Sequence, residues 1–177
     1  HQEPPGSAAR SHWKLLVAQR PIFIAVIGAG NEAPESALNA AEEVGRLLAE
    51  RGATVVCGGL NGVMEAVSRG ARQAGGRTIG VLPGDDHEAA NEWIDIPIPT
   101  GLGYARNAVV VKTGDAVIAI AGAFGTLSEI GHSIADGKTV VGLNTWELSR
   151  DGAPDASIIR AESPAAAVEI AISAANK

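Results

Sequence analysis

Residues 22–30 read IFIAVIGAG, and this stretch decides the fold. Uninterrupted apolar residues that end in Gly-x-Gly are typical of a central parallel strand, covered on both faces and followed by a tight turn. A helical period follows, in which Leu38, Ala41 and Val44 share one face, and Gly52 ends it. A strand followed by a helix is the repeating unit of an α/β fold.

The same unit recurs along the chain. Short β-branched runs predict further strands at 53–57, 78–82, 116–120, 139–143 and 158–159, and a proline-containing extended piece at 95–99 suits a sheet edge. Helices are expected between them, and the polar segments 84–92 and 147–155 are interpreted as connections, the first long enough to be a lid or to face a partner. We therefore predict an α/β, Rossmann-like, doubly wound parallel sheet of about six or seven strands in three layers.

Length and composition suit one domain of this kind. The chain has 177 residues, 46% of them hydrophobic, so we predict a single domain over residues 21–177. Residues 1–20 do not begin with Met and contain the run PPGS, and we interpret them as a tail or tag-like segment.

Charge and cysteine content exclude several classes of function. A formal net charge of −6 argues against binding to nucleic acid or to an anionic membrane surface. No apolar run reaches the ~18 residues that a membrane span requires. The lone Cys57 excludes an internal disulfide and fits a reducing compartment, so a cytoplasmic location is expected. We expect no metal site, because His87 and His132 stand without a set of ligands around them.

Three of the predicted strand-to-helix turns are rich in glycine, and all three fall at the carboxyl edge of the sheet. Glycine lets backbone N–H groups approach a ligand, and the start of a helix favours an anion. A phosphate or nucleotide site is therefore predicted, although each turn taken singly is equally explained by a tight change of chain direction. The candidate ligand-binding residues are Gly28, Gly30, Gly58, Gly59, Gly62, Gly122, Phe124, Gly125 and Thr126, with Asn31, Met64 and Tyr104 as pocket wall.

Two familiar nucleotide motifs are disfavoured or absent. The first turn fits G-x-G-x-x-G/A, but the next strand ends in Cys57-Gly58 where a ribose-binding Asp or Glu would stand. No G-x-x-x-x-G-K-[ST] occurs. An NAD-dependent dehydrogenase and a Walker-type NTPase are thus not expected.

Four segments, in this order, carry a family resemblance: GGLNGVME at 58–65, GGRTIGVLP at 75–83, GYARN at 103–107 and AGAFGTLSE at 121–129. With them the chain resembles the Lonely Guy superfamily, long labelled possible lysine decarboxylases. That superfamily includes phosphoribohydrolases, which cleave a nucleoside 5′-monophosphate into free base and ribose 5-phosphate, and molybdenum-cofactor carrier proteins. Its members form dimers or larger oligomers, so the resemblance implies a homodimer or higher homo-oligomer here.

The signature of the hydrolases, PGGxGTxxE, is altered in this chain. Ala121 stands in place of Pro and Ala123 in place of the second Gly. The superfamily's catalytic arginine matches Arg106 and its acid matches Glu129, but Asn107 stands where a basic residue usually follows. The pattern is more similar to the carrier-type and uncharacterised branch than to the plant-type hydrolases.

The favoured hypothesis is a protein that binds a phosphorylated nucleotide-like or pterin-type ligand at the carboxyl edge. We expect no required cofactor, and a nucleotide or the molybdenum cofactor is a candidate ligand. The first alternative is a nucleoside 5′-monophosphate phosphoribohydrolase, in which Glu129 faces the ribose and Arg106 manages phosphate or leaving-group charge. The second alternative is an oligomeric scaffold whose segment 84–92 binds a protein.

The same residues have simpler interpretations. Thr126 and Glu129 match a helix capping box, and Arg106 would then be a solvated or interface arginine. Tyr104 and Phe124 could stack on a ligand ring or only wall the pocket. A pyridoxal-dependent decarboxylase is rejected, because no lysine lies in a glycine turn; the lysines are Lys14, Lys112, Lys138 and Lys177.

Overall fold

A computed structural model of the chain describes residues 20–177, so all of the predicted tail except Arg20 lies outside the described residues. The strands are β1 (Phe23–Gly28), β2 (Thr54–Cys57), β3 (Arg77–Leu82), β4 (Ile96–Pro99), β5 (Ala116–Ile120), β6 (Val140–Leu143), β7 (Leu148–Arg150), β8 (Ala153–Asp155) and β9 (Ile158–Arg160). The helices are α2 (Glu35–Glu50), α3 (Val63–Gln73), α4 (Arg106–Thr113), α5 (Phe124–Ala135) and α6 (Pro164–Ala175), with short 3-10 turns η1 (His87–Ala89) and η2 (Gly103–Ala105).

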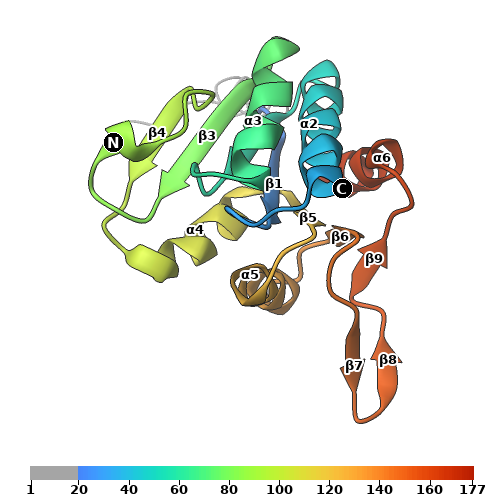
Figure 1. Cartoon of the computed structure of the whole chain (residues 1–177). Coiled ribbons are helices and arrows are strands. Elements are labelled where there is room, and N and C mark those ends of the chain that lie inside the picture. Colours follow the sequence, from blue (N-terminus) through green and yellow to red (C-terminus); the bar gives the residue numbers. More distant parts are fainter. Residues whose placement is uncertain (1–19) are drawn as a thin grey trace, which may run out of the picture.

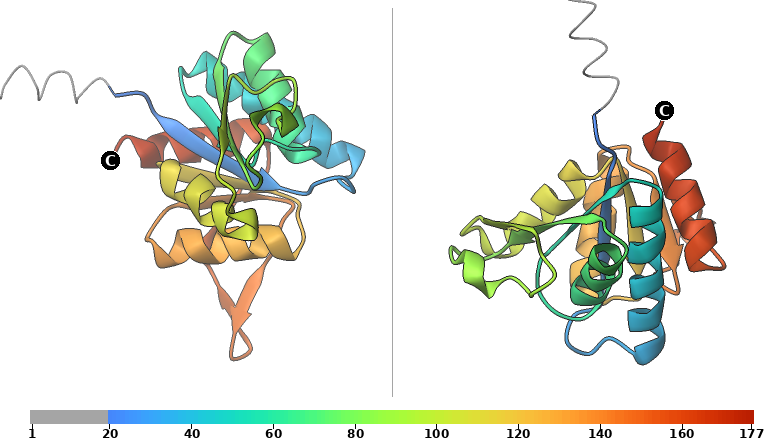
Figure 2. Two further views of the ribbon diagram at one scale, coloured as in Figure 1. Left: turned by 90° about the vertical axis from the view of Figure 1, so that its left-hand side faces the viewer. Right: turned by 90° about the horizontal axis from the view of Figure 1, so that it is seen from above.

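Seven strands form one parallel sheet in the order β4-β3-β2-β1-β5-β6-β9. Helices α2, α3 and α6 cover one face, and α4 and α5 cover the other (Figures 1 and 2). The three-layer, doubly wound fold predicted from the sequence is confirmed.

Strand alternation explains the two halves of the core. In β1, Ile24 and Val26 pack with α2, α3 and α6, whereas Ala25 and Ile27 pack with α4 and α5. Successive side chains of a strand point to opposite faces, so a strand that is apolar throughout fits only between two helical layers.

Strand β4 forms one edge of the sheet, as its prolines predicted. The N–H group of Thr100 donates to the carbonyl of Leu82 at 3.2 Å, so alternate residues of this segment turn their backbone groups toward β3. Pro97 and Pro99 occupy the outward positions, where a missing N–H breaks no ladder hydrogen bond.

One element was not predicted. Residues 147–155 contain the antiparallel pair β7 and β8, which projects from the body of the molecule (Figure 1). Asp151 and Gly152 both have positive φ, at 52° and 78°, as a type I′ hairpin turn requires. An Asp-Gly pair is itself a hairpin signal, but the residues on either side are mostly polar and lack the apolar alternation by which strands are predicted.

One helix start differs from expectation. Helix α5 begins at Phe124 with Ala123 as its N-cap and no side-chain cap, so the capping-box interpretation of Thr126 and Glu129 is wrong. Both residues lie inside the helix because it starts earlier than the Thr-x-x-Glu pattern suggested. Residues 103–105 form a separate 3-10 turn before α4 begins at Arg106.

Within residues 20–177, the structure contains no helix that is both long and apolar enough to cross a lipid bilayer.

Candidate functional site

The order of the strands reverses between β1 and β5, and the turns that leave these two strands diverge. In open parallel sheets a ligand crevice forms at such a switch point, outside the carboxyl ends of the strands. A cleft of about 780 Å³ lies there, between residues 28–32 after β1 and residues 121–126 after β5. The fold thus supplies a site of the size that small-molecule ligands occupy.

Most of the predicted site residues meet in this cleft. Its lining includes Gly28, Gly30, Asn31, Gly58, Met64, Tyr104, Arg106, Gly122, Gly125, Thr126 and Glu129. Gly59, Gly62 and Phe124 are not part of the lining. Glu32 and Pro34 also line the cleft but were not predicted as site residues, since neither is a glycine of the turn patterns.

Gly62 lets the second glycine turn pack closely against the first one. It caps α3 with φ +69°, and a Cβ there would lie 2.1 Å from the carbonyl oxygen of Gly30. The N–H of Val63 donates to Ala29 O at 2.9 Å, and the Asn61 amide donates to Asn31 Oδ1 at 2.8 Å. The second glycine turn is therefore fastened to the first one beside the cleft.

Gly59 faces the segment 84–92 instead of the cleft. The backbone N–H of Asn91 donates to Gly59 O at 2.9 Å, and the Asn91 side-chain amide donates to Leu60 O at 2.8 Å. The segment proposed as a lid or partner-facing loop is thus anchored on the outer side of this turn.

Arg106 is a buried cation in the cleft. It begins α4, is only 9% exposed, and donates to Asn107 Oδ1 and, at 3.4 Å, to the carbonyl oxygen of Gly58. Its Nε is buried and has no hydrogen-bond partner within the described part of the chain. Burial lowers the pKa of the guanidinium, and the charge of Glu129 opposes this shift. The solvated interpretation of Arg106 is therefore wrong, and a buried cation lines the cleft without a direct ion pair among residues 20–177.

Glu129 is the buried acid of the same site. It projects from α5, is 8% exposed, and burial raises its pKa to about 7, although attraction to Arg106 acts in the opposite direction. Among the ion pairs of residues 20–177, none joins Glu129 to Arg106. A carboxyl group with such a pKa can hold or release a proton near neutral pH, as a general acid or base must.

Backbone donors complete the cleft. The N–H of Ala121 donates to Leu143 O, and that of Leu127 donates to Ala123 O, both at 3.0 Å. Between them, the N–H groups of residues 122–126 find no acceptor among residues 20–177. These groups precede and open α5, where the helix dipole favours negative charge. Together with Arg106, they form a region of the cleft suited to an anion.

The two predicted stacking residues have different positions. Tyr104 is 92% exposed and lines the cleft from η2. Phe124 is 78% exposed and lies against Trp146, with ring centroids 5.5 Å apart. Tyr104 is therefore placed to contact a bound ring, whereas Phe124 belongs to an aromatic pair beside the cleft.

The chain is similar to several characterised proteins. It is 34% identical over 132 residues to the cytokinin riboside 5′-monophosphate phosphoribohydrolase of Mycobacterium tuberculosis, covering 70% of this chain and 71% of that one. Among solved structures, the molybdenum cofactor binding protein from the phototrophic bacterium Rippkaea orientalis superposes with a TM-score of 0.79 at 34% identity, covering 88% of this chain and 98% of that chain. The Moco carrier protein from Chlamydomonas reinhardtii gives a TM-score of 0.77 at 31% identity, with 88% and 98% covered.

These similarities confirm the resemblance to both branches seen in the sequence. The family model described as the SLOG cluster4 family matches residues 21–168, which include the sheet, the cleft and all four motifs. The chain belongs to the SLOG cluster4 family.

Proposed function

We propose that this protein binds a phosphorylated, nucleotide-like or pterin-type small molecule in the cleft between β1 and β5. The observation that carries the proposal is the buried Arg106, whose Nε lacks a partner, on the same cleft as the unpaired N–H groups of residues 122–126. Buried polar groups in proteins are satisfied as a rule, so an unpaired buried donor calls for a ligand or an ordered water. Similarity to molybdenum cofactor binding proteins supports a ligand that is carried.

The arrangement suggests how such a ligand would lie. Its phosphate would sit at the start of α5, beside the N–H groups there and in the field of Arg106, which lines the same cleft. Its planar ring would extend toward Tyr104 at the exposed side of the cleft. In this arrangement the molybdenum cofactor would be bound as cargo.

Ligand-dependent stabilisation tests this proposal. Thermal unfolding and calorimetry with AMP, GMP and isolated molybdenum cofactor should give saturable binding to the wild-type protein. A ligand at one hundred times its Kd stabilises the folded state by about 2.7 kcal/mol. Arg106→Met should abolish this effect, whereas Arg160→Met, which removes an exposed arginine remote from the cleft, should retain it. No binding by any of these ligands to the wild-type protein would refute the proposal.

A second function is favoured by the position of Glu129, a buried carboxyl group that lines the same cleft as Arg106 and whose pKa burial raises to about 7. In phosphoribohydrolase chemistry the N-glycosidic bond breaks as positive charge develops on the ribose. Ionised Glu129 would stabilise that charge or take the proton of an attacking water, and Arg106 would hold the phosphate. Water adds to the sugar carbon, and the base leaves with a proton. The products are free base and ribose 5-phosphate.

Base release decides between carriage and hydrolysis. If the protein is a hydrolase, adenine accumulates from AMP and Glu129→Gln stops the release while AMP binding persists. If AMP or another monophosphate binds but no base is released from any nucleoside monophosphate, the binding function stands alone.

A further inference from the structure

Two side chains from the segment after β6 hold the 121–126 loop from outside the cleft. The hydroxyl of Thr145 donates to the carbonyl oxygen of Ala121 at 2.5 Å. The indole Nε1 of Trp146 donates to the carbonyl oxygen of Ala123 at 3.1 Å. These hydrogen bonds join the turn that leaves β5 to the segment that leaves β6.

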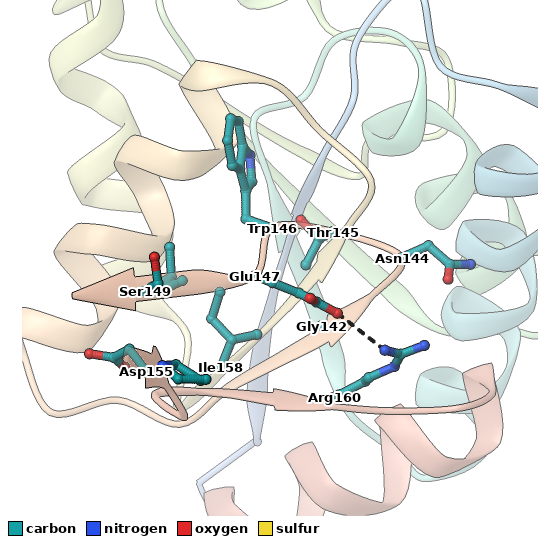
Figure 3. Close-up of a pocket in the computed structure, with 11 residues that line it drawn as sticks. Gly142, Asn144, Thr145, Trp146, Glu147, Ser149, Asp155, Ile158 and Arg160 are labelled. Atoms are coloured by element: carbon teal, nitrogen blue, oxygen red, sulfur yellow. Dashed lines mark hydrogen bonds and ion pairs between the residues drawn. The ribbon is translucent and has the colours of Figure 1, made fainter. Parts of the chain in front are cut away.

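Neither residue lines the cleft described above. Thr145 and Trp146 line a second cavity of about 690 Å³, bounded also by the β7–β8 hairpin and β9 (Figure 3). In Figure 3 the Trp146 side chain points away from the Glu147–Arg160 ion pair. Ala121 and Ala123 line the first cleft but are held by residues of the second cavity, so the loop runs between the two.

The two held carbonyl groups also fix the direction of the N–H groups in the same peptide units. No cis peptide bond occurs among residues 20–177, and in a trans peptide the C=O and the following N–H point in opposite directions. The carbonyls of Ala121 and Ala123 are directed at Thr145 and Trp146. The N–H groups of the same peptide units, those of Gly122 and Phe124, therefore point away from the second cavity. Gly122 lines the first cleft, and Phe124 stands in the chain between Ala123 and Gly125, which both line it.

The loop requires such support because its backbone is strained. Ala121 has φ +50°, in the left-handed region that residues with a Cβ seldom occupy. A proline, which stands at this place in the hydrolase signature, fixes φ near −65° and could not adopt this conformation. The backbone path at Ala121 is consequently held by its neighbours, of which Thr145 is one.

We propose that Thr145 and Trp146 are positioning residues of the anion site, and that they hold two loop carbonyls so that the N–H groups of Gly122 and Phe124 meet a ligand phosphate. This inference rests on the proposed function, since it names the residues that prepare its phosphate subsite. Arg106 on the same cleft is nine-tenths buried, and its Nε has no hydrogen-bond partner among residues 20–177, which is the independent sign that an anionic ligand is received there.

The test uses inorganic phosphate as the charged probe and adenosine as the uncharged one, in NMR titrations of the full chain. Thr145→Val keeps the shape and removes the donor, and Trp146→Phe keeps a ring against Phe124 but lacks the indole N–H. Each variant should raise the Kd for phosphate about threefold to tenfold, the value of one hydrogen bond, and leave that for adenosine unchanged. Thr145→Ser should restore phosphate affinity. Thr113→Val, which removes a comparable hydroxyl bond to Val109 O on α4, should have no effect.

The backbone amide signals of Gly122 and Phe124 separate the outcomes. In the wild-type protein both should shift on addition of phosphate, and the shifts should shrink in Thr145→Val and Trp146→Phe. Phosphate binding that leaves both signals unmoved, or equal affinities in all variants, would overturn this inference while the proposed function stands. Equal loss of phosphate and adenosine affinity would reduce both residues to a structural role. A wild-type protein that binds neither phosphate nor any phosphorylated ligand would overturn both proposals. Should Trp146→Phe fail to fold, the Thr145→Val and Thr145→Ser pair decides.

Discussion

Glu129 is a buried acid whose ionised form lowers the stability of the fold. Burial favours its neutral form and raises its pKa to about 7, from an ordinary value of 4.5. The folded protein therefore keeps a proton that the unfolded chain releases between these two pH values. The free energy of unfolding should fall as pH rises through this window, by up to about 3 kcal/mol, and show no further loss from this group at higher pH.

Replacing the acid should remove this pH dependence. We expect Glu129→Gln to be more stable than the wild-type protein at pH 8 and to lose the advantage near pH 4.5, because glutamine does not ionise. Urea unfolding across this range measures the difference. Glu162→Gln, at a side chain that is 83% exposed, is the control and should show no such trend. A Glu129→Gln protein that is no more stable than wild type at pH 8 would contradict this account.

Gly58 keeps open the space that the Arg106 guanidinium fills. A Cβ at this position would lie 2.7 Å from Arg106 Nη2 and 2.6 Å from Met64 Sδ, both far ends of flexible side chains. We expect Gly58→Ala to fold but to displace Arg106, weakening binding of a phosphorylated ligand about tenfold, the value of a hydrogen bond to a charged group. Calorimetry measures the affinity. Unchanged affinity in this variant would show that Arg106 does not hold the ligand.

At the scale of elements, the first and second glycine turns depend on one another. Gly62→Ala places a Cβ against the Gly30 carbonyl and imposes a left-handed φ on alanine. The variant should lose about 2 kcal/mol or more of unfolding free energy, measured by urea denaturation. Gly30→Ala is the matched control, because a Cβ there meets no atom within 4 Å, and its loss should stay below about 1 kcal/mol. Equal losses in both variants would refute this explanation.

The same elements show what could be predicted from the sequence. Runs such as residues 22–27 identified the central strands, because burial on both faces leaves no room for polar alternation. Arg106 and Glu129 could be placed at one edge from strand order and motif. The sequence could not tell which glycine of the second turn lines the cleft. Gly58 does, whereas Gly62 packs against the first turn, and both belong to the same local glycine pattern. Thr145 and Trp146 act across strands on backbone carbonyls, and no sequence motif marks such contacts.

Across the whole molecule, the carboxyl and amino ends of the parallel strands differ in the charged groups they carry. The cleft at the carboxyl edge holds Arg106 and unpaired N–H groups within a chain of formal net charge −6. Lys112 and Lys138 lie near the amino ends of β5 and β6, where Lys112 pairs with Asp136. Neither lysine lines the cleft.

The prolines of the edge strand β4 are expected to limit self-association of the protein. The backbone nitrogens of Pro97 and Pro99 lie on the side of β4 that faces away from β3, so this edge lacks two of the N–H donors that a further strand would use. Replacing both by alanine should restore these donors beside the exposed Ile96 and Ile98 and promote self-association. Light scattering at increasing protein concentration measures it. Identical scattering by the Pro97→Ala, Pro99→Ala double variant and the wild-type protein would contradict this role.

These prolines also limit how two copies of the chain can meet. A neighbour that approaches β4 finds apolar side chains but few backbone donors, so contact on that side is made by side-chain packing and the sheet cannot continue from one molecule into the next. Growth into an open-ended fibre through this edge is thereby blocked, whereas a closed assembly of a few copies remains compatible with it.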